Sequence, residues 1–182
     1  MEEKYVLDFL QNENNYYLIN NDNNSLKKIT DFLPKDFCLY HIEELTFEEK
    51  SPRKEALENV LSALRLDGLN FLYLIVGDKG GVHFYFGVVK NLCQNKNIDL
   101  EIDDIGKDIL KPSITGNFRG SKITELRPKD KLEIKSKLNQ MSDFGILEGV
   151  PGINKDNENF QGVDRLVDVM LGDDFVVAVI AS

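Results

Sequence analysis

The chain has two histidines, and each lies in a stretch with the alternating pattern of a β-strand. His41 stands between Tyr40 and Ile42, and His83 lies close to Tyr85. A histidine can act as a general base, but it needs a nucleophile or a substrate proton within hydrogen-bond reach. No serine or cysteine nucleophile pairs with either histidine in a recognisable motif. We therefore interpret both as half-buried strand residues and predict that this chain carries no catalytic residue.

A glycine-rich segment at residues 77–81 reads Gly-Asp-Lys-Gly-Gly and invites comparison with a phosphate-binding loop. A P-loop needs the pattern GxxxxGK[ST] between a strand and a helix, so that backbone N–H groups cradle the phosphates. Here the lysine precedes the glycine pair, no serine or threonine follows, and the next stretch is again strand-like. We predict a hairpin turn instead, in which Gly80 and Gly81 supply the positive-φ positions.

Neither the carboxylates nor the cysteines have the spacing of a metal site. Glu101, Asp103 and Asp104 precede or open an expected helix, where the helix dipole favours negative charge. Cys38 and Cys93 are far apart and have no CxxC partner. We interpret the cysteines as reduced core residues, and we expect neither a metal nor a cofactor.

The net charge of −9 argues against nucleic acid as a partner, because affinity for phosphate backbones rests on lysine and arginine. Four lysines at 129, 131, 135 and 137 are interleaved with Asp130 and Glu133, a pattern typical of a solvated helix face. The apolar run Phe71 to Val76 is far shorter than the roughly 20 residues of a membrane helix. The acidic N-terminus does not resemble a secretory signal, so we expect a cytoplasmic protein without membrane insertion.

The length of 182 residues suits one domain, with a variable segment at 1–36 and an α/β core at 37–182. In the first segment we expect a short strand at 16–19 and a helix at 26–33. The core pattern predicts the order β-α-β-β-α-β-α-β-α-β, with strands at 37–47, 71–76, 82–89, 123–126, 144–150 and 175–181. Helices are expected at 51–64, from 102 to a point before Pro112, at 128–138 and at 160–171.

The first six core elements match a ferredoxin-like split β-α-β arrangement, and the remaining αβ units would extend a mixed sheet. The fold class is therefore α/β in the broad sense, or α+β. The apolar, β-branched stretch at 175–181 is typical of a strand that is buried on both faces.

Three short motifs resemble a known family. They are Ile-Thr-Gly-Asn-Phe-Arg-Gly at 114–120, Gly-Val-Pro-Gly-Ile at 149–153, and Phe-Gln-Gly-Val-Asp-Arg-Leu at 160–166. Together, over residues 70–182, they resemble the N-terminal region of bacterial ATP-binding proteins of the HerA/FtsK-like and type IV secretion group. Arg119 stands where that family has a proline, and Gly152 where it has a polar residue.

The resemblance implies a non-catalytic assembly or partner-docking domain of a larger P-loop ATPase, with the motor core beyond residue 182. It implies turns at Gly116, Gly149 and Pro151. It also implies interface contacts, in a ring of subunits or with a protein partner, by Gln161, Asp164 and Arg165. Two alternatives come from the residues themselves. One is a stand-alone acidic adaptor or immunity-type protein that captures a basic protein, and the other is a free-standing enzyme, for which the sequence lacks a nucleophile or metal constellation.

Overall fold

The computed structural model describes residues 34–46, 53–91, 98–143, 145 and 167–181, together with the backbone of residues 16–20 and 25–29. Two strands near the N-terminus, β1 (Tyr16–Asn20) and β2 (Ser25–Ile29), form an antiparallel hairpin. The expected strand at 16–19 is thus present, but the expected helix at 26–33 is wrong over Ser25–Ile29. The spacing of a few apolar residues does not separate helix from strand, and pairing with β1 decides for a strand here.

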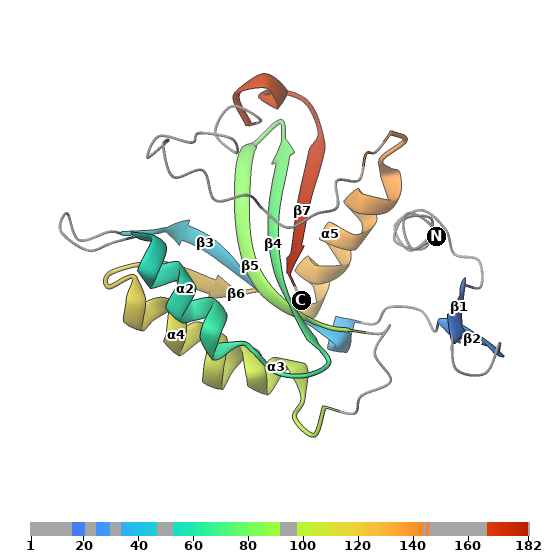
Figure 1. Cartoon of the computed structure of the whole chain (residues 1–182). Coiled ribbons are helices and arrows are strands. Elements are labelled where there is room, and N and C mark those ends of the chain that lie inside the picture. Colours follow the sequence, from blue (N-terminus) through green and yellow to red (C-terminus); the bar gives the residue numbers. More distant parts are fainter. Residues whose placement is uncertain are drawn as a thin grey trace, which may run out of the picture.

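The main sheet has five strands in the order β6-β3-β5-β4-β7. Its strands are β3 (Phe37–Glu44), β4 (Leu69–Asp78), β5 (Gly81–Lys90), β6 (Lys122–Glu125) and β7 (Phe175–Ala181). The first four, with one helical segment after β3 and another after β5, have the connectivity and strand order of the ferredoxin-like split β-α-β arrangement (Figure 1). The fold is therefore α+β, as the sequence predicts.

The fifth strand, β7, extends this sheet by pairing with β4. Every strand pair in the described part of the sheet is antiparallel, so the expectation of a mixed sheet is wrong there. The expectation that β7 is buried on both faces is also wrong, because Ala178 to Ala181 are exposed. An apolar, β-branched sequence reports a preference for strands, whereas burial depends on whether neighbours cover the strand.

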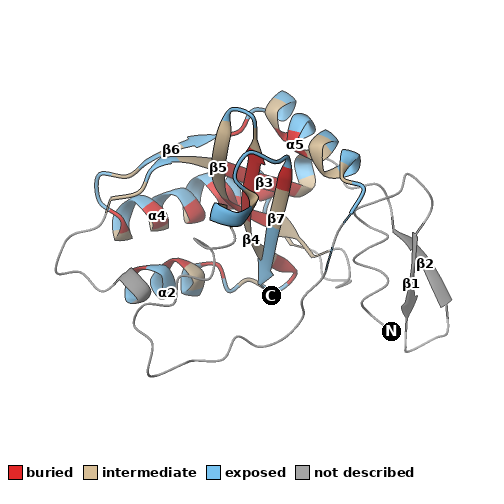
Figure 2. Cartoon of the chain, turned by 90° about the horizontal axis from the view of Figure 1, so that it is seen from above, coloured by how far each residue is buried: buried red, intermediate tan, exposed pale blue. Residues whose placement is uncertain are grey.

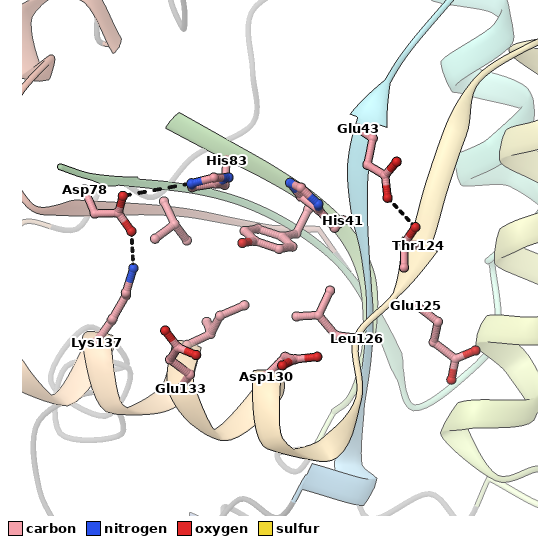
Figure 3. Close-up of a pocket in the computed structure, with 13 residues that line it drawn as sticks. His41, Glu43, Asp78, His83, Thr124, Glu125, Leu126, Asp130, Glu133 and Lys137 are labelled. Carbon is pink, nitrogen blue, oxygen red and sulfur yellow. Dashed lines mark hydrogen bonds and ion pairs between the residues drawn. The ribbon is translucent and has the colours of Figure 1, made fainter. Parts of the chain in front are cut away.

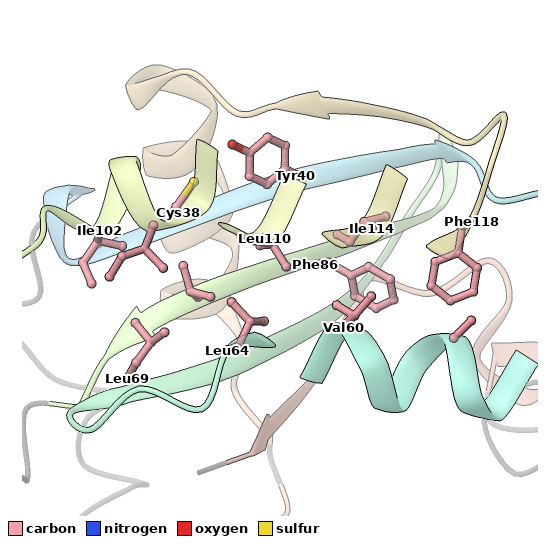
Figure 4. Close-up of a cluster of buried hydrophobic side chains, with 13 residues drawn as sticks. Cys38, Tyr40, Val60, Leu64, Leu69, Phe86, Ile102, Leu110, Ile114 and Phe118 are labelled. Atoms are coloured by element: carbon pink, nitrogen blue, oxygen red, sulfur yellow. The ribbon is translucent and has the colours of Figure 1, made fainter. Parts of the chain in front are cut away.

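Two helical segments cover one face of the sheet (Figure 4). They are α2 (Arg53–Ala63) and a helix without a break that comprises α3 (Ile102–Ile105), η2 (Gly106–Leu110) and α4 (Lys111–Asn117). Their apolar side chains pack against strand residues in a single buried cluster, which includes Cys38, Tyr40, Val60, Phe86, Leu110 and Ile114. Because helix positions three and four apart share one face, both segments bury a stripe and expose the rest (Figure 2).

The helix after β5 continues past Pro112, whereas the sequence predicted that it ends before this proline. Proline has no N–H to donate to the preceding turn. Directly before it, η2 is a π-helical turn in which the Lys111 N–H donates to the Gly106 oxygen, five residues back. This wider turn accommodates the missing bond, so the helix runs on to Asn117. Gly116, for which a turn was predicted, consequently lies inside α4, and the positive φ of this region belongs to Gly120, at 83°.

The opposite face of the sheet is covered by α5 (Pro128–Gln140). Leu126 and Ile134 pack there against Phe37, Leu39 and Leu74. The chain enters this layer where the Leu126 N–H donates to the Leu39 carbonyl oxygen at 2.9 Å. The described residues contain no helix that is long and apolar enough to cross a membrane.

Candidate functional site

A cleft of about 290 Å3 lies between α5 and the sheet (Figure 3). Strands β3, β4 and β5 form its floor, the end of β6 forms one side, and α5 forms the other. Thirteen residues line it: His41, Glu43, Val76, Asp78, His83, Tyr85, Thr124, Glu125, Leu126, Asp130, Glu133, Ile134 and Lys137. The cleft is therefore built from five different elements, and only the tertiary structure brings them together.

Regular periodicity explains why these side chains share one surface. In a strand, residues two apart point to the same face, and this places the pairs 41 and 43, 76 and 78, and 83 and 85 over the cleft. On α5, the lining positions 130, 133, 134 and 137 have the spacing of one helix face. The floor and the helical wall thus follow from local structure once the strands are in register.

The two histidines of the chain meet in this cleft. His41 of β3 lies opposite Tyr85 of β5, and His83 lies two residues before Tyr85. The imidazole ring centroids of His41 and His83 are 5.6 Å apart, and the His41 ring is 5.1 Å from the Tyr85 ring. Burial, together with the nearby His83, lowers the pKa of His41 below its usual 6.5, so this ring is neutral at pH 7.

An ion pair closes the end of the cleft at the β4–β5 turn. Asp78 accepts hydrogen bonds from the Lys137 ammonium group and, at 2.7 Å, from the Gly80 N–H. These two bonds lower the pKa of the Asp78 carboxyl. The His83 Nε2 atom lies 3.9 Å from an oxygen of the same carboxylate. Asp78 therefore stays ionised near neutral pH and faces both a lysine and a histidine.

The cleft carries an excess of negative charge. Its lining residues carry five carboxylates, on residues 43, 78, 125, 130 and 133, against one lysine, Lys137, but the Glu125 carboxylate is turned away, toward Cys38 and Asp103, which leaves four (Figure 3). Thr124 donates a hydrogen bond to Glu43, and Arg127 pairs with Asp130 at 3.0 Å. In the part of the chain that the structure describes, no ion pair reaches Glu43 or Glu133. A cationic group that enters the cleft would thus find carboxylates that are not already engaged in an ion pair.

A second group of metal-ligand atoms lies at the edge of the sheet, away from the histidines. Ligand atoms of Cys38, Asp103 and Glu125 lie within 4.8 Å of one another. Burial raises the pKa of the Cys38 thiol to about 11, and a thiol must lose its proton to bind a metal. Lys131 already places its ammonium group 2.9 Å from Asp103. The chemistry of this group therefore does not suit a divalent cation.

The structure places only some of the residues that the sequence singled out. Gly80 lies in the tight turn between β4 and β5 but does not have a positive φ, so that expectation is wrong for Gly80, whereas Gly81 begins β5 with a φ of 126°. Gly116 lies in α4 and does not line the cleft. The predicted turns at Gly149 and Pro151, and the predicted interface residues Gln161, Asp164 and Arg165, lie outside the described residues. So do nearly all of the predicted strand at 144–150 and residues 160–166 of the predicted helix at 160–171. The same holds for Cys93.

Sequence reasoning missed the cleft as a site. It treated each histidine separately, and it interpreted the lysines of α5 as a solvated face. The structure corrects the second point, because Lys131 is only 3% exposed and Lys137 reaches across to Asp78. The available signal was the 130, 133, 134, 137 spacing, which puts two carboxylates and a lysine on one helix face.

Fold and site together define an α+β domain with an acidic, histidine-containing cleft. No protein-family model matches the sequence, and neither a curated protein nor a solved structure matches it significantly.

Proposed function

We propose that this chain is a docking domain that holds a basic segment of a protein partner in the acidic cleft. The observation that carries this proposal is the excess of four carboxylates, on residues 43, 78, 130 and 133, over one lysine in the cleft. The one lysine is already bound to Asp78, and a single positive charge does not balance the remaining carboxylates. Complementary charge of this kind steers association and selects partners.

The size and shape of the cleft suit side chains of the partner better than a whole domain. A volume of about 290 Å3 is at the lower end of the range for small-ligand pockets. One or two lysine or arginine side chains fill such a space, and Tyr85 and Ile134 offer apolar contact for their methylene stems. Glu43 and Glu133 then act as the anchoring carboxylates, because both line the cleft and are exposed.

The parent protein is, on our proposal, a ring-forming P-loop ATPase of the HerA/FtsK-like type, in which this domain docks or assembles and hydrolysis belongs to another part. The three motifs at 114–120, 149–153 and 160–166 support this assignment. The alternative is a stand-alone acidic adaptor. An immunoblot of the source cells with an antibody against this domain distinguishes them: a band well above 20.8 kDa supports a larger parent, and a band at that mass contradicts it.

The docking proposal is tested by fluorescence anisotropy with a labelled hexa-arginine peptide in a buffer that contains EDTA. The double variant Glu43→Gln, Glu133→Gln removes two charges from the cleft and should weaken binding at least about tenfold, as expected for charge-assisted contacts. The matched control, Glu55→Gln with Asp108→Asn, removes two exposed charges elsewhere. Equal loss in both double variants would mean that only net charge matters and would overturn the docking site.

A second candidate function, self-association, is favoured by strand β7. This strand carries no charge or proline, and among the described strands it pairs only with β4. Val179 and Ile180 are 45% and 52% exposed. Natural sheet edges usually carry lysine, proline or a bulge that prevents pairing with another chain. Antiparallel pairing of β7 with a second copy would cover these residues.

Sedimentation equilibrium tests this second candidate. We expect a concentration-dependent dimer that Ile180→Lys abolishes, because a lysine there protects the edge. Val169→Lys is the control, since Val169 is 83% exposed but lies outside the sheet. A monomer at all concentrations, or an equal effect of both substitutions, would contradict pairing through β7.

A further inference from the structure

We infer that His41 and His83 together bind a divalent transition-metal ion of the zinc type at the floor of the cleft. This inference is independent of the docking proposal, because it rests on the two imidazoles and not on the surrounding charge. Neutral imidazole nitrogen is a preferred ligand of Zn2+, Cu2+ and Ni2+.

The spacing of the two rings fits joint coordination of one ion. A Zn–N bond of about 2.0–2.1 Å places each ring centroid roughly 3.2 Å from the metal, so two tetrahedral ligands have centroids about 5–5.5 Å apart. The observed separation of 5.6 Å matches this arrangement closely. Figure 3 shows the two rings side by side on neighbouring strands, with a ring nitrogen of His41 turned toward His83.

Strand pairing holds this arrangement in place. Antiparallel register sets Tyr85 opposite His41 and Val76 opposite His83, which makes the histidines diagonal neighbours on one face. Both ligands thus stand on adjacent central strands, β3 and β5, whose backbones are hydrogen-bonded on both sides. Little reorganisation is needed when the ion binds, because the scaffold is rigid.

The neighbours of the pair favour a bound cation. An oxygen of Asp78 lies 3.9 Å from the Nε2 atom of His83, too far for a hydrogen bond but close enough for the carboxylate to attract a nearby cation. Glu43 follows His41 by two residues on the same face of β3. The His83 side chain is 38% exposed, so an ion and its water ligands reach the pair from solvent.

Isothermal titration of the full chain with ZnCl2 at pH 7.5, without chelator, tests the inference. We expect one Zn2+ per chain and an affinity that falls as the pH is lowered to 5.5, because protonated imidazole cannot bind metal. His41→Gln and His83→Gln should each weaken binding at least about tenfold, since even residues that only orient a ligand cost that much. Circular dichroism confirms that both variants fold.

The control variant is Asp103→Asn, which belongs to the separate group at Cys38 and should leave the Zn2+ affinity unchanged. The histidine signals give a second readout, because the chain has only these two and Zn2+ should shift both together in NMR spectra. Three results would overturn the inference: no binding up to millimolar Zn2+, unchanged affinity in both histidine variants, or loss of binding in Asp103→Asn. The peptide-docking assay contains EDTA, which removes free metal ions. Failure of one proposal therefore does not imply failure of the other.

Discussion

The ammonium group of Lys131 lies 2.9 Å from a carboxylate oxygen of Asp103, although α5 and α3 belong to opposite faces of the sheet. Lys131 passes the edge of β3 and also donates to the Phe37 carbonyl oxygen at 2.8 Å and the Pro34 carbonyl oxygen at 3.3 Å. The side chain of Lys131 is 3% exposed, whereas that of Asp103 is 55% exposed. Lys131 of α5 therefore contacts both the start of β3 and the helix on the opposite face of the sheet.

The first prediction concerns this lysine. Lys131→Met keeps the apolar stem but leaves the Phe37 carbonyl oxygen without its buried donor. We expect a loss of about 1–3 kcal/mol in the free energy of unfolding, measured by urea denaturation. Asp103→Asn should cost less than about 1 kcal/mol, because ion pairs with an exposed partner contribute little. Similar losses in both variants would show that the ion pair, and not the carbonyl contact, stabilises this junction.

The second prediction concerns the approach of η2 to β3. A methyl group on Gly106 would overlap the sulfur atom of Cys38 and come within 3.0 Å of its β-carbon. Gly106→Ala should therefore destabilise the chain by about 1–3 kcal/mol through overpacking. In the Cys38→Ala background the sulfur is absent, so the same substitution should cost clearly less. Urea denaturation of the four variants forms a double-mutant cycle, and additive losses would contradict the contact.

The third prediction concerns the reactivity of Cys38. Its thiol is fully buried, and burial raises its pKa to about 11. Because the thiolate is the reactive form, Cys38 should resist a thiol reagent such as Ellman's reagent at pH 8 in the folded protein. The measurement uses Cys93→Ser, so that Cys38 is the one cysteine left. Reaction should become rapid in urea, and rapid labelling in the native buffer would contradict the buried position.

The fourth prediction concerns pH. The pKa of His41 is lower in the folded chain than its usual 6.5, so the unfolded chain binds more protons between the two values. Stability therefore rises with pH across this window, and the contribution of His41 is lost as the pH falls from 7.5 to 5.5. His41→Gln should flatten this dependence in urea denaturation. An NMR titration that places the pKa of His41 at or above 6.5 would contradict the mechanism.

Local pattern predicted several elements well, because the relevant information lies within a few neighbouring residues. The strands at 71–76 and 82–89 and the glycine turn between them correspond to β4 and β5. The helix from Pro128 corresponds to α5, and the β-α-β-β-α-β order corresponds to the ferredoxin-like strand order. Alternation and helical spacing suffice for such elements.

Other features could not be predicted locally. The continuation through Pro112 depends on a π turn, and this turn brings Gly106 against Cys38 on a distant strand. Lys131 is buried because α5 packs beside the first residues of β3, where β3 extends beyond the end of β6. Pro112 inside a helix and Lys131 in a buried position are both unfavourable by local preference. In each case contacts with residues distant in the sequence compensate for this.

The sequence alone determined the α+β class, the β-α-β-β-α-β order of the first core elements, the acidic charge and the absence of a P-loop in this chain. Tertiary structure decided that His41 and His83 meet, that Lys137 joins Asp78, and that β7 stands at an edge. The physical reason is the register of the strands. Periodicity tells which face a strand residue occupies, but a shift of pairing by two residues keeps that face and separates the histidines.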